Sequence, residues 1–258
     1  MYHYIVNPSS GDRSFDGIAS KLKAKLRQLG IDGPFDKTID VKDTAKITHA
    51  AIRSGAQTIV AVGGDKTVNE VITAVNESGK SSTSIGIIPL GHRNTLAGQV
   101  GITDWQHATE LLAARRLRSF RLMDVNDYSF IQSCEIQMPN DDSLDSLIEV
   151  DGSYRVKAPM SRCRISNTRL SNPHLSDELL VQIYGGQPEP GLFDRLVGRS
   201  RDERDMSQLH ARVIALELPA DVTAQVDGRP IVDRHFRIRL SQKPVRIISA
   251  RYDNGDNI

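Results

Sequence analysis

The segment from Thr58 to Val75, TIVAVGGDKTVNEVITAV, constrains the fold of this chain more than any other stretch. Residues 58–62 are β-branched or apolar throughout, which is typical of a strand buried on both faces of a parallel sheet. After two glycines, apolar residues recur at the spacing of a helix. The segment therefore predicts a strand, a tight glycine loop and a helix.

The glycine loop of this segment is a candidate anion site. In open α/β sheets, ligands bind at the carboxyl ends of the strands, and a helix that starts there offers backbone N–H groups and a positive dipole end to a phosphate. Asp65 is the first charged side chain after Gly63 and Gly64. Taken alone, however, a glycine pair is more often a plain strand-to-helix turn, so the phosphate interpretation depends on the neighbouring loops.

Strands and helices alternate over about the first 115 residues, which predicts a parallel sheet with right-handed crossovers. The further strands are expected at 2–6, 36–41 and 84–88, and the further helices from Ile18 to Leu29, at 43–54 and at 105–114.

After Arg121 the apolar periodicity changes to two, which predicts an all-β second half. Strands are expected at 154–158, 163–165, 179–184, 213–218, 222–226, 236–240 and 245–248. Residues 191–209 are the exception and predict a short helix with a charged, solvated connector. The expected fold is α/β, with a doubly wound parallel-sheet domain at 1–121 and a mainly antiparallel β-sandwich domain at 122–258.

Composition excludes several classes of function. A formal net charge of +1 gives no argument for nucleic-acid binding, and no apolar run approaches the length of a membrane span. The first residues do not resemble a secretory signal, and Cys134 and Cys163 lie far apart without metal-ligand spacing. A cytoplasmic location with reduced thiols is the expectation.

Four motifs follow one another along the chain: NPSSG at 7–11, GGDKTVNEV at 63–71, PLGHRN at 89–94 and VDGR at 226–229. In this order they resemble the diacylglycerol kinase catalytic-domain family, which includes bacterial lipid kinases and sphingosine kinases and is distantly related to NAD kinases and phosphofructokinases. The family pattern is NPxSG, GGDGTxNEV, PLGTGN and an aspartate-glycine-glutamate motif. The resemblance covers nearly the whole chain.

The resemblance implies a two-domain kinase that uses ATP and Mg²⁺, with the nucleotide on the α/β domain and the acceptor against the β-domain. Asp65 and Asp227 match the candidate catalytic carboxylates, and Asp124 matches a carboxylate of a magnesium–water network. The expected nucleotide-binding residues are Asn7, Gly11, Gly63, Gly64, Lys66, Thr67, Glu70, Gly91, Arg93 and Asn94. Without the resemblance, Asp227-Gly228 is simply a strong hairpin signal and Asp124 a capping or turn residue.

Several positions depart from the family pattern. Lys66 replaces a glycine, His92-Arg93 replaces Thr-Gly, Arg229 replaces the last glutamate, and Thr95 stands where many relatives carry aspartate. A side chain at a glycine position either blocks the nucleotide or replaces backbone contacts by charge. One hypothesis is an anion site with reduced dependence on magnesium, and the opposite one is a degenerate kinase that no longer accepts ATP.

The function expected from these features is an ATP-dependent, lipid kinase-like transfer of a γ-phosphoryl group to a diacylglycerol-like or other amphiphilic alcohol. The alternatives are a pseudokinase or phosphate-binding regulatory module without turnover and, third, an NAD kinase-like activity. The expected partners are a nucleotide and a lipid or amphiphilic acceptor, with no nucleic acid. The sequence leaves open a transient contact with a membrane surface and a homodimer.

Overall fold

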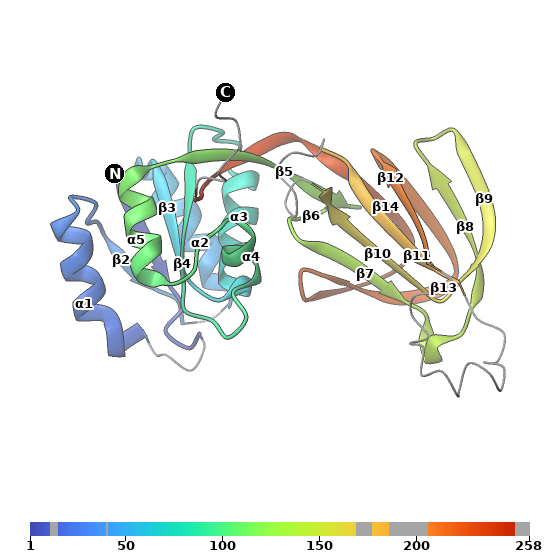
Figure 1. The fold of residues 1–258 in the computed structure, drawn as a ribbon, viewed down its shortest axis with the longest axis horizontal. Coiled ribbons are helices and arrows are strands. Elements are labelled where there is room, and N and C mark those ends of the chain that lie inside the picture. Colours follow the sequence, from blue (N-terminus) through green and yellow to red (C-terminus); the bar gives the residue numbers. More distant parts are fainter. Residues whose placement is uncertain (11–14, 40, 169–176, 186–205, 251–258) are drawn as a thin grey trace, which may run out of the picture. The chain divides into compact units, whose positions relative to one another are not determined.

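A computed structural model describes residues 1–10, 15–39, 41–168, 177–185 and 206–250 of the chain (Figure 1). The chain divides into two compact units, the first formed by Met1–Arg121 with Gln242–Ile258 and the second by Leu122–Ser241. Residues 242–250, which were expected in the all-β domain at 122–258, are grouped with the first unit in this division.

The first unit is built on a parallel sheet with the strand order β14-β4-β3-β1-β2. Its strands are β1 (Tyr2–Val6), β2 (Phe35–Lys37), β3 (Thr58–Gly63), β4 (Ser84–Pro89) and the end of β14 (Arg229–Ile248). Every residue of β3 and β4 is buried, as the apolar runs predict for strands covered on both faces.

Helices cover both faces of this sheet (Figure 1). The helices are α1 (Phe15–Gln28), α2 (Val41–Arg53), α3 (Asp65–Glu77), α4 (Thr95–Gln99) and α5 (Trp105–Ala114). Helix α1 contacts α5, and α2 contacts α3. Strand β1 has β2 on one side and β3 on the other. The loop after β1 leads toward β2 and the loop after β3 leads toward β4, so the two loops diverge at a topological switch point. Sheets of this kind bind ligands at such a point.

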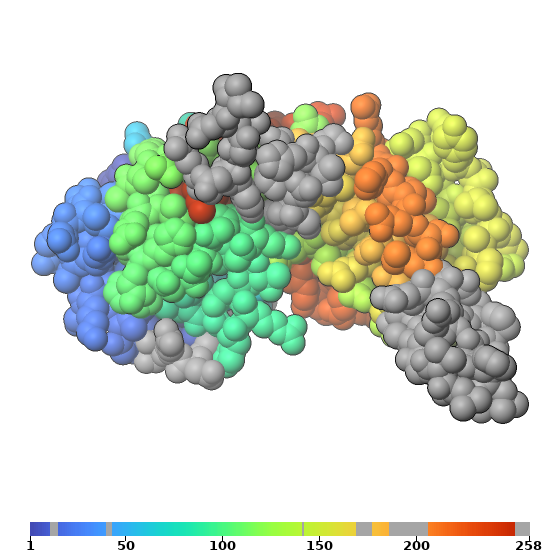
Figure 2. Space-filling model, viewed as in Figure 1, coloured from blue at the N-terminus to red at the C-terminus, as the bar shows by residue number. Residues whose placement is uncertain are grey.

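The second unit is antiparallel. Its strands are β5 (Leu117–Val125, which starts in the first unit), β6 (Tyr128–Phe130), β7 (Ser133–Gln137), β8 (Leu144–Val150), β9 (Tyr154–Met160), β10 (Arg162–Asn167), β11 (Leu179–Tyr184), β12 (Met206–Ala211), β13 (Val213–Val226) and most of β14. A 3₁₀ turn, η1 (Pro139–Asp141), precedes β8. Strand β13 pairs with β14 along its length, with β8 near its start and with β7 near its end. The core between these strands is apolar, and Figure 2 shows the β8–β9 hairpin, in yellow, at the surface of the unit.

Several sequence-based bounds differ from the structure. The strand expected at 36–41 is only three residues long, and residues 213–226 and 229–248 each form one strand where two were expected. Residues 206–209 belong to a strand and not to a connector, while the short helix expected near residue 193 lies outside the described residues. Strands β6 to β8 and helix α4 were not anticipated. Within the described ranges, no helix has both the length and the apolar character needed to cross a membrane.

Candidate active site

The loop after β1 is tied to the start of α3. Asn7 Nδ2 donates a hydrogen bond to Thr67 Oγ1 at 3.2 Å, and Asn7 Oδ1 accepts one from Ser9 N at 3.0 Å. A Cβ added to Gly63 would lie 2.7 Å from Thr67 Oγ1 and 3.0 Å from Ser10 Oγ. The absence of a Cβ at Gly63 therefore allows the hydroxyl groups of Ser10 and Thr67 to lie this close to its backbone. Gly11, the last residue of the NPSSG motif, lies outside the described residues.

The loops after β3 and β4 meet at two glycines. A Cβ added to Gly91 would lie 2.5 Å from the Cα atom of Gly64, and Leu90 N donates to Gly63 O at 2.9 Å. Contacts below 3 Å are not tolerated by backbone atoms, so the approach of these loops needs a glycine at 91. This packing leaves the carboxyl edge of β3 and β4 without side chains at the point of contact.

Asn94 fixes the shape of the loop after β4. It has a left-handed backbone, with φ 47° and ψ 42°, which asparagine tolerates better than most residues. Its Oδ1 accepts from Gly91 N at 2.8 Å, and its Nδ2 donates to Gly91 O at 2.6 Å. Both polar atoms of the side chain are thus used within the loop, which gives Asn94 a structural task beside its expected contact with a nucleotide.

Asp65 links α3 to α4. Its Oδ2 accepts a hydrogen bond from Thr95 N at 2.8 Å, and its Oδ1 accepts one from Leu96 N at 3.0 Å. Thr95 and Leu96 are the first residues of α4, so the carboxylate takes up N–H groups that have no partner inside that helix. This contact could not be predicted from the sequence, because Asp65 lies about 30 residues before Thr95 and Leu96 along the chain.

The N-terminus of α3 is open to an anion. Its N-cap is Gly64, which makes no side-chain capping bond, and the helix runs for 13 residues. The first N–H groups of a helix have no intrahelical acceptor and carry the positive end of its dipole. Gly63, Gly64 and Gly91 place no Cβ beside these donors, an arrangement typical of helix N-termini that bind phosphate.

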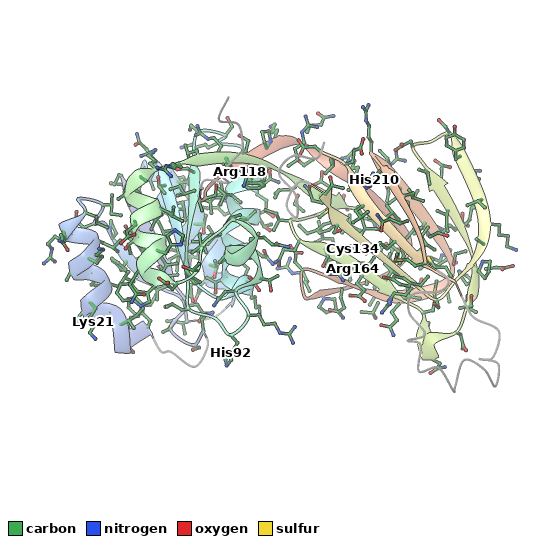
Figure 3. All side chains as sticks on the ribbon, viewed as in Figure 1. Lys21, His92, Arg118, Cys134, Arg164 and His210 are labelled. Carbon is green, nitrogen blue, oxygen red and sulfur yellow. The ribbon has the colours of Figure 1, made fainter. Side chains whose placement is uncertain are left out.

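Two cations flank this helix start. Lys66 and Arg93 are exposed, as is His92, which Figure 3 labels on the loop after β4. Neither Lys66 nor Arg93 forms an ion pair with a residue that the structure describes. Glu70 is half-buried one helical turn beyond Lys66.

Asn69 is a polar residue of this region that was not among the expected site residues. Both polar atoms of its side-chain amide are buried and have no hydrogen-bond partner within the described part of the chain. Such orphaned groups are rare in folded proteins and need an explanation, of which a ligand is one. The sequence signal was its place in the NEV part of the glycine-loop motif.

Asp227 belongs to the second unit, where it anchors a hairpin. Asp227 and Gly228 have positive φ values of 48° and 79° and connect β13 to β14, as the hairpin signal predicts. The Asp227 carboxylate accepts hydrogen bonds from the backbone N–H groups of Ile131 at 2.9 Å, Gln132 at 3.0 Å and Ser133 at 2.8 Å. These bonds occupy both oxygens and hold the hairpin against the turn between β6 and β7.

Asp124, the expected metal residue, also lies in the second unit. Its Oδ1 accepts from Ser129 Oγ at 2.7 Å, and its Oδ2 lies 3.9 Å from Arg239 Nε. A hydroxyl and a guanidinium surround it instead of further carboxylates. Across the described residues, no three His, Cys, Asp or Glu side chains gather in a way that could hold a metal ion.

A surface pocket of about 530 Å³ lies on the second unit, across β8, β13 and β14. Leu147 and Ala215 contribute apolar surface, and Glu149, Glu217 and Arg237 contribute charge. None of the candidate site residues lines it. The candidates brought together by the structure are those of the first unit, while Asp124, Asp227 and Arg229 belong to the second.

Comparison with known proteins agrees with this architecture. The sequence profile of the diacylglycerol kinase catalytic domain matches residues 1–125. A probable lipid kinase YegS-like protein of Klebsiella pneumoniae (strain 342) is 38% identical over 265 residues, which cover 86% of this chain and 87% of the relative.

Solved structures show the same fold. A diacylglycerol kinase from Bacillus anthracis strain Sterne superposes with a TM-score of 0.78 at 18% identity, over 96% of both chains. An NAD kinase from Archaeoglobus fulgidus, solved in complex with ATP, gives a TM-score of 0.65 at 14% identity, over 96% of this chain and 94% of the other. From the profile match and the identity to the Klebsiella protein, we conclude that the chain belongs to the diacylglycerol kinase catalytic-domain family and is a lipid kinase-like phosphotransferase.

Proposed function

We propose that this protein transfers the γ-phosphoryl group of ATP to the hydroxyl of a diacylglycerol-like or other amphiphilic alcohol. The observation that carries the proposal is the uncapped N-terminus of α3 beside the packed glycines Gly64 and Gly91. Phosphoryl transfer needs mainly positioning and neutralisation of charge, and a helix N-terminus provides both for a phosphate.

In this proposal, the N–H groups at the start of α3 hold phosphate oxygens of ATP. Thr67 and Asn7 fix the wall of the site through their mutual hydrogen bond, and Asn94 keeps the opposite loop in place. The buried amide of Asn69 offers its NH₂ group as a donor and its carbonyl oxygen as an acceptor to a nucleotide, which would satisfy groups that are otherwise without a partner. Lys66 and Arg93 add positive charge at the mouth of the site.

The two candidate catalytic aspartates have different places in the proposal. Asp65 acts as a positioning residue, because both of its oxygens already accept hydrogen bonds from the start of α4. Asp227 is engaged in the same way by three backbone N–H groups. A loose transition state does not need a strong general base. Catalysis through positioning and electrostatics is therefore compatible with the hydrogen bonds that both aspartates accept.

Membership in a kinase family implies ATP and a divalent metal. The donor set of the described residues does not form a metal cage, since Asp65 is occupied and no cluster of three ligands occurs. Mg²⁺ is commonly bound through substrate phosphates, waters and only one or two carboxylates. We therefore attribute no step of the proposed reaction to a protein-bound metal.

A second candidate function is nucleotide or phosphate binding without turnover. It is favoured by the same observation, that the carboxylates of Asp65 and Asp227 are both occupied by backbone donors. NAD kinase-like activity remains a third candidate, for which the likeness to the Archaeoglobus enzyme offers only the fold.

The three candidates are separated by one experiment in two stages. The protein is first titrated with ATP in the presence of magnesium and then incubated with γ-labelled ATP and one acceptor at a time: diacylglycerol in mixed micelles, a soluble alcohol, or NAD. We expect binding at submillimolar ATP and label on the amphiphilic acceptor. Binding without label on any acceptor would favour the non-catalytic module, and label on NAD alone would favour the third candidate. No binding at millimolar ATP would refute both kinase candidates and nucleotide binding by the non-catalytic module.

A further inference from the structure

We infer that Lys66 and Arg93 serve as built-in counterions for the ATP phosphates, so that the site binds ATP without a divalent metal nearly as well as with one. The inference rests on the proposed function and concerns the same site. Lys66 and Arg93 both stand at positions where the family pattern has glycine. In this inference, they determine whether ATP binds with or without a divalent metal.

The first support is the position of the two residues. Lys66 lies two residues after Gly64, and Arg93 lies two residues after Gly91. Because Gly64 and Gly91 are in backbone contact, each cation has its Cα within about 7.6 Å of that contact, at 3.8 Å per residue. Lysine and arginine side chains are long enough to span most of that distance, so both can reach a phosphate bound at the start of α3.

The second support is that both charges are uncommitted. Lys66 and Arg93 are exposed and make no ion pair within the described part of the chain. The Asp65 carboxylate, next to Lys66 in the sequence, accepts hydrogen bonds from the N–H groups of Thr95 and Leu96. The loops after β3 and β4 thus present two cations without an ion pair among the described residues, while each Asp65 oxygen already accepts a backbone N–H.

The third support is that the charges on these loops are unfavourable for a divalent metal ion. A divalent cation on the phosphates is attracted by free carboxylates and repelled by neighbouring ammonium and guanidinium groups. Guanidinium and ammonium groups instead bind phosphate oxygens directly, through charge-assisted hydrogen bonds. ATP without magnesium carries more negative charge than its magnesium complex and gains more from two cations.

The test is a pair of ATP titrations by calorimetry, one with excess magnesium and one with EDTA, on the wild-type chain and on Lys66→Gln, Arg93→Gln and the double variant. We expect the wild-type Kd in EDTA to lie within about tenfold of that with magnesium. Each single variant should weaken binding in EDTA by about tenfold, the value of one charge-assisted hydrogen bond, and binding with magnesium by much less.

Arg53→Gln is the matched control, since Arg53 is an exposed arginine in the last turn of α2 and precedes β3, at the opposite end of that strand from the glycines. It removes one positive charge and should change neither titration by more than about twofold. A wild-type protein that binds ATP only with magnesium, or variants that bind ATP equally well in EDTA, would refute the counterion role and leave the kinase proposal standing. Absence of binding in both buffers would refute the kinase proposal itself.

Discussion

Gly64 and Gly91 are in contact through their backbones, with the position of a Cβ on Gly91 only 2.5 Å from the Cα of Gly64. This contact holds the loops after β3 and β4 together and keeps the start of α3 free of side chains. The geometry of the proposed phosphate site therefore depends on the absence of a Cβ atom at Gly91.

Gly91→Ala should destabilise the protein by about 1–3 kcal/mol, the range found for overpacking, because the added methyl group must displace backbone atoms. ATP binding should be lost at the same time, as the loops separate. Urea unfolding and an ATP titration measure the two effects. Gly98→Ala is the control, since a Cβ there meets no atom within 4 Å; it should leave stability unchanged or raise it by about 0.5–1 kcal/mol. Equal behaviour of the two variants would contradict the packing argument.

Asp65→Asn tests whether Asp65 positions the loops or acts as a base. An asparagine has a single acceptor oxygen for the N–H groups of Thr95 and Leu96, so we expect a loss of about 1 kcal/mol in the free energy of unfolding. The pH dependence of kcat should keep its shape, with kcat reduced by about tenfold. A loss of kcat by a factor of about a thousand or more, with unchanged stability, would identify Asp65 as the base instead.

Asn69→Leu should separate stability from binding. The buried amide of Asn69 has no partner in the described structure, and replacing it by an apolar side chain of similar size removes that penalty. We expect the free energy of unfolding to rise by about 1 kcal/mol and the Kd for ATP to increase by about tenfold. A variant that loses stability but keeps its affinity would show that the amide has a structural role and does not contact the ligand.

Asp227→Asn isolates the hydrogen bonds of the hairpin anchor. Asparagine tolerates the positive φ of 48°, so the turn itself is retained, but one oxygen has to serve three N–H groups. A loss of about 1–3 kcal/mol in unfolding free energy is expected, with faster amide exchange at residues 131–133. Asp221→Asn, at an exposed position of the same strand, should be neutral, and a similar effect of both variants would point to net charge as the cause.

Asp104 gives a prediction about pH. It caps α5, and the hydrogen bond that its Oδ1 accepts from His107 N, at 2.8 Å, is the main reason that the pKa of this carboxyl lies below its usual value. A lowered pKa stabilises the fold above the unfolded-state pKa of about 3.9, and this contribution is lost as the pH falls through the lower folded-state value.

Asp104→Ala should therefore cost about 1 kcal/mol at pH 7, the typical value of an N-cap, and less at pH 2–3. Thermal unfolding at both pH values, with Asp104→Asn as a variant that keeps the cap without the charge, measures the difference. If the alanine variant lost the same amount at both pH values, the charge of Asp104 would have no part in the cap.

Local sequence patterns predicted the bounds of elements that have a clear periodicity and recognisable end residues. Helix α5 has its expected bounds, Trp105–Ala114, because Asp104 caps its start and apolar residues keep a helical period. Strand β11 likewise has the expected bounds Leu179–Tyr184. The short helix α4 was missed, since five residues without a side-chain cap give too little periodic signal.

The continuity of the long strands could not be predicted locally. Pro219 and Pro244 both argue against a strand interior, because proline donates no hydrogen bond to a ladder. In the structure Pro219 falls within the register shift of β13 between Glu217 and Val222, and Pro244 precedes the point where β14 pairs with β4. The pairing of β13 and β14 with neighbouring strands, and not the local sequence, therefore determines that each forms one long strand.

For the site, the sequence placed the glycine loops at the carboxyl edge of the sheet, and the structure gathers them there. It could not show that Asp65 would be bound by the first N–H groups of α4, or that Asn69 would be buried without a partner. Such contacts join residues that are brought together only by the packing of α3 against α4 and the sheet. The catalytic role of Asp227 stays a prediction that rests on the family resemblance.

Because the first unit contains both the start and the end of the described chain, the second unit is an insertion between Arg121 and Gln242. The two connecting strands, β5 and β14, pair with each other, and Ser249 N donates to Arg116 O at 3.1 Å within the first unit. A short turn that joins residues 121 and 242 directly would therefore close β5 and β14 into a hairpin. The loops after β3 and β4 could then be studied on a minimal chain of about half the length, which would separate the proposed nucleotide binding from every contribution of the second unit.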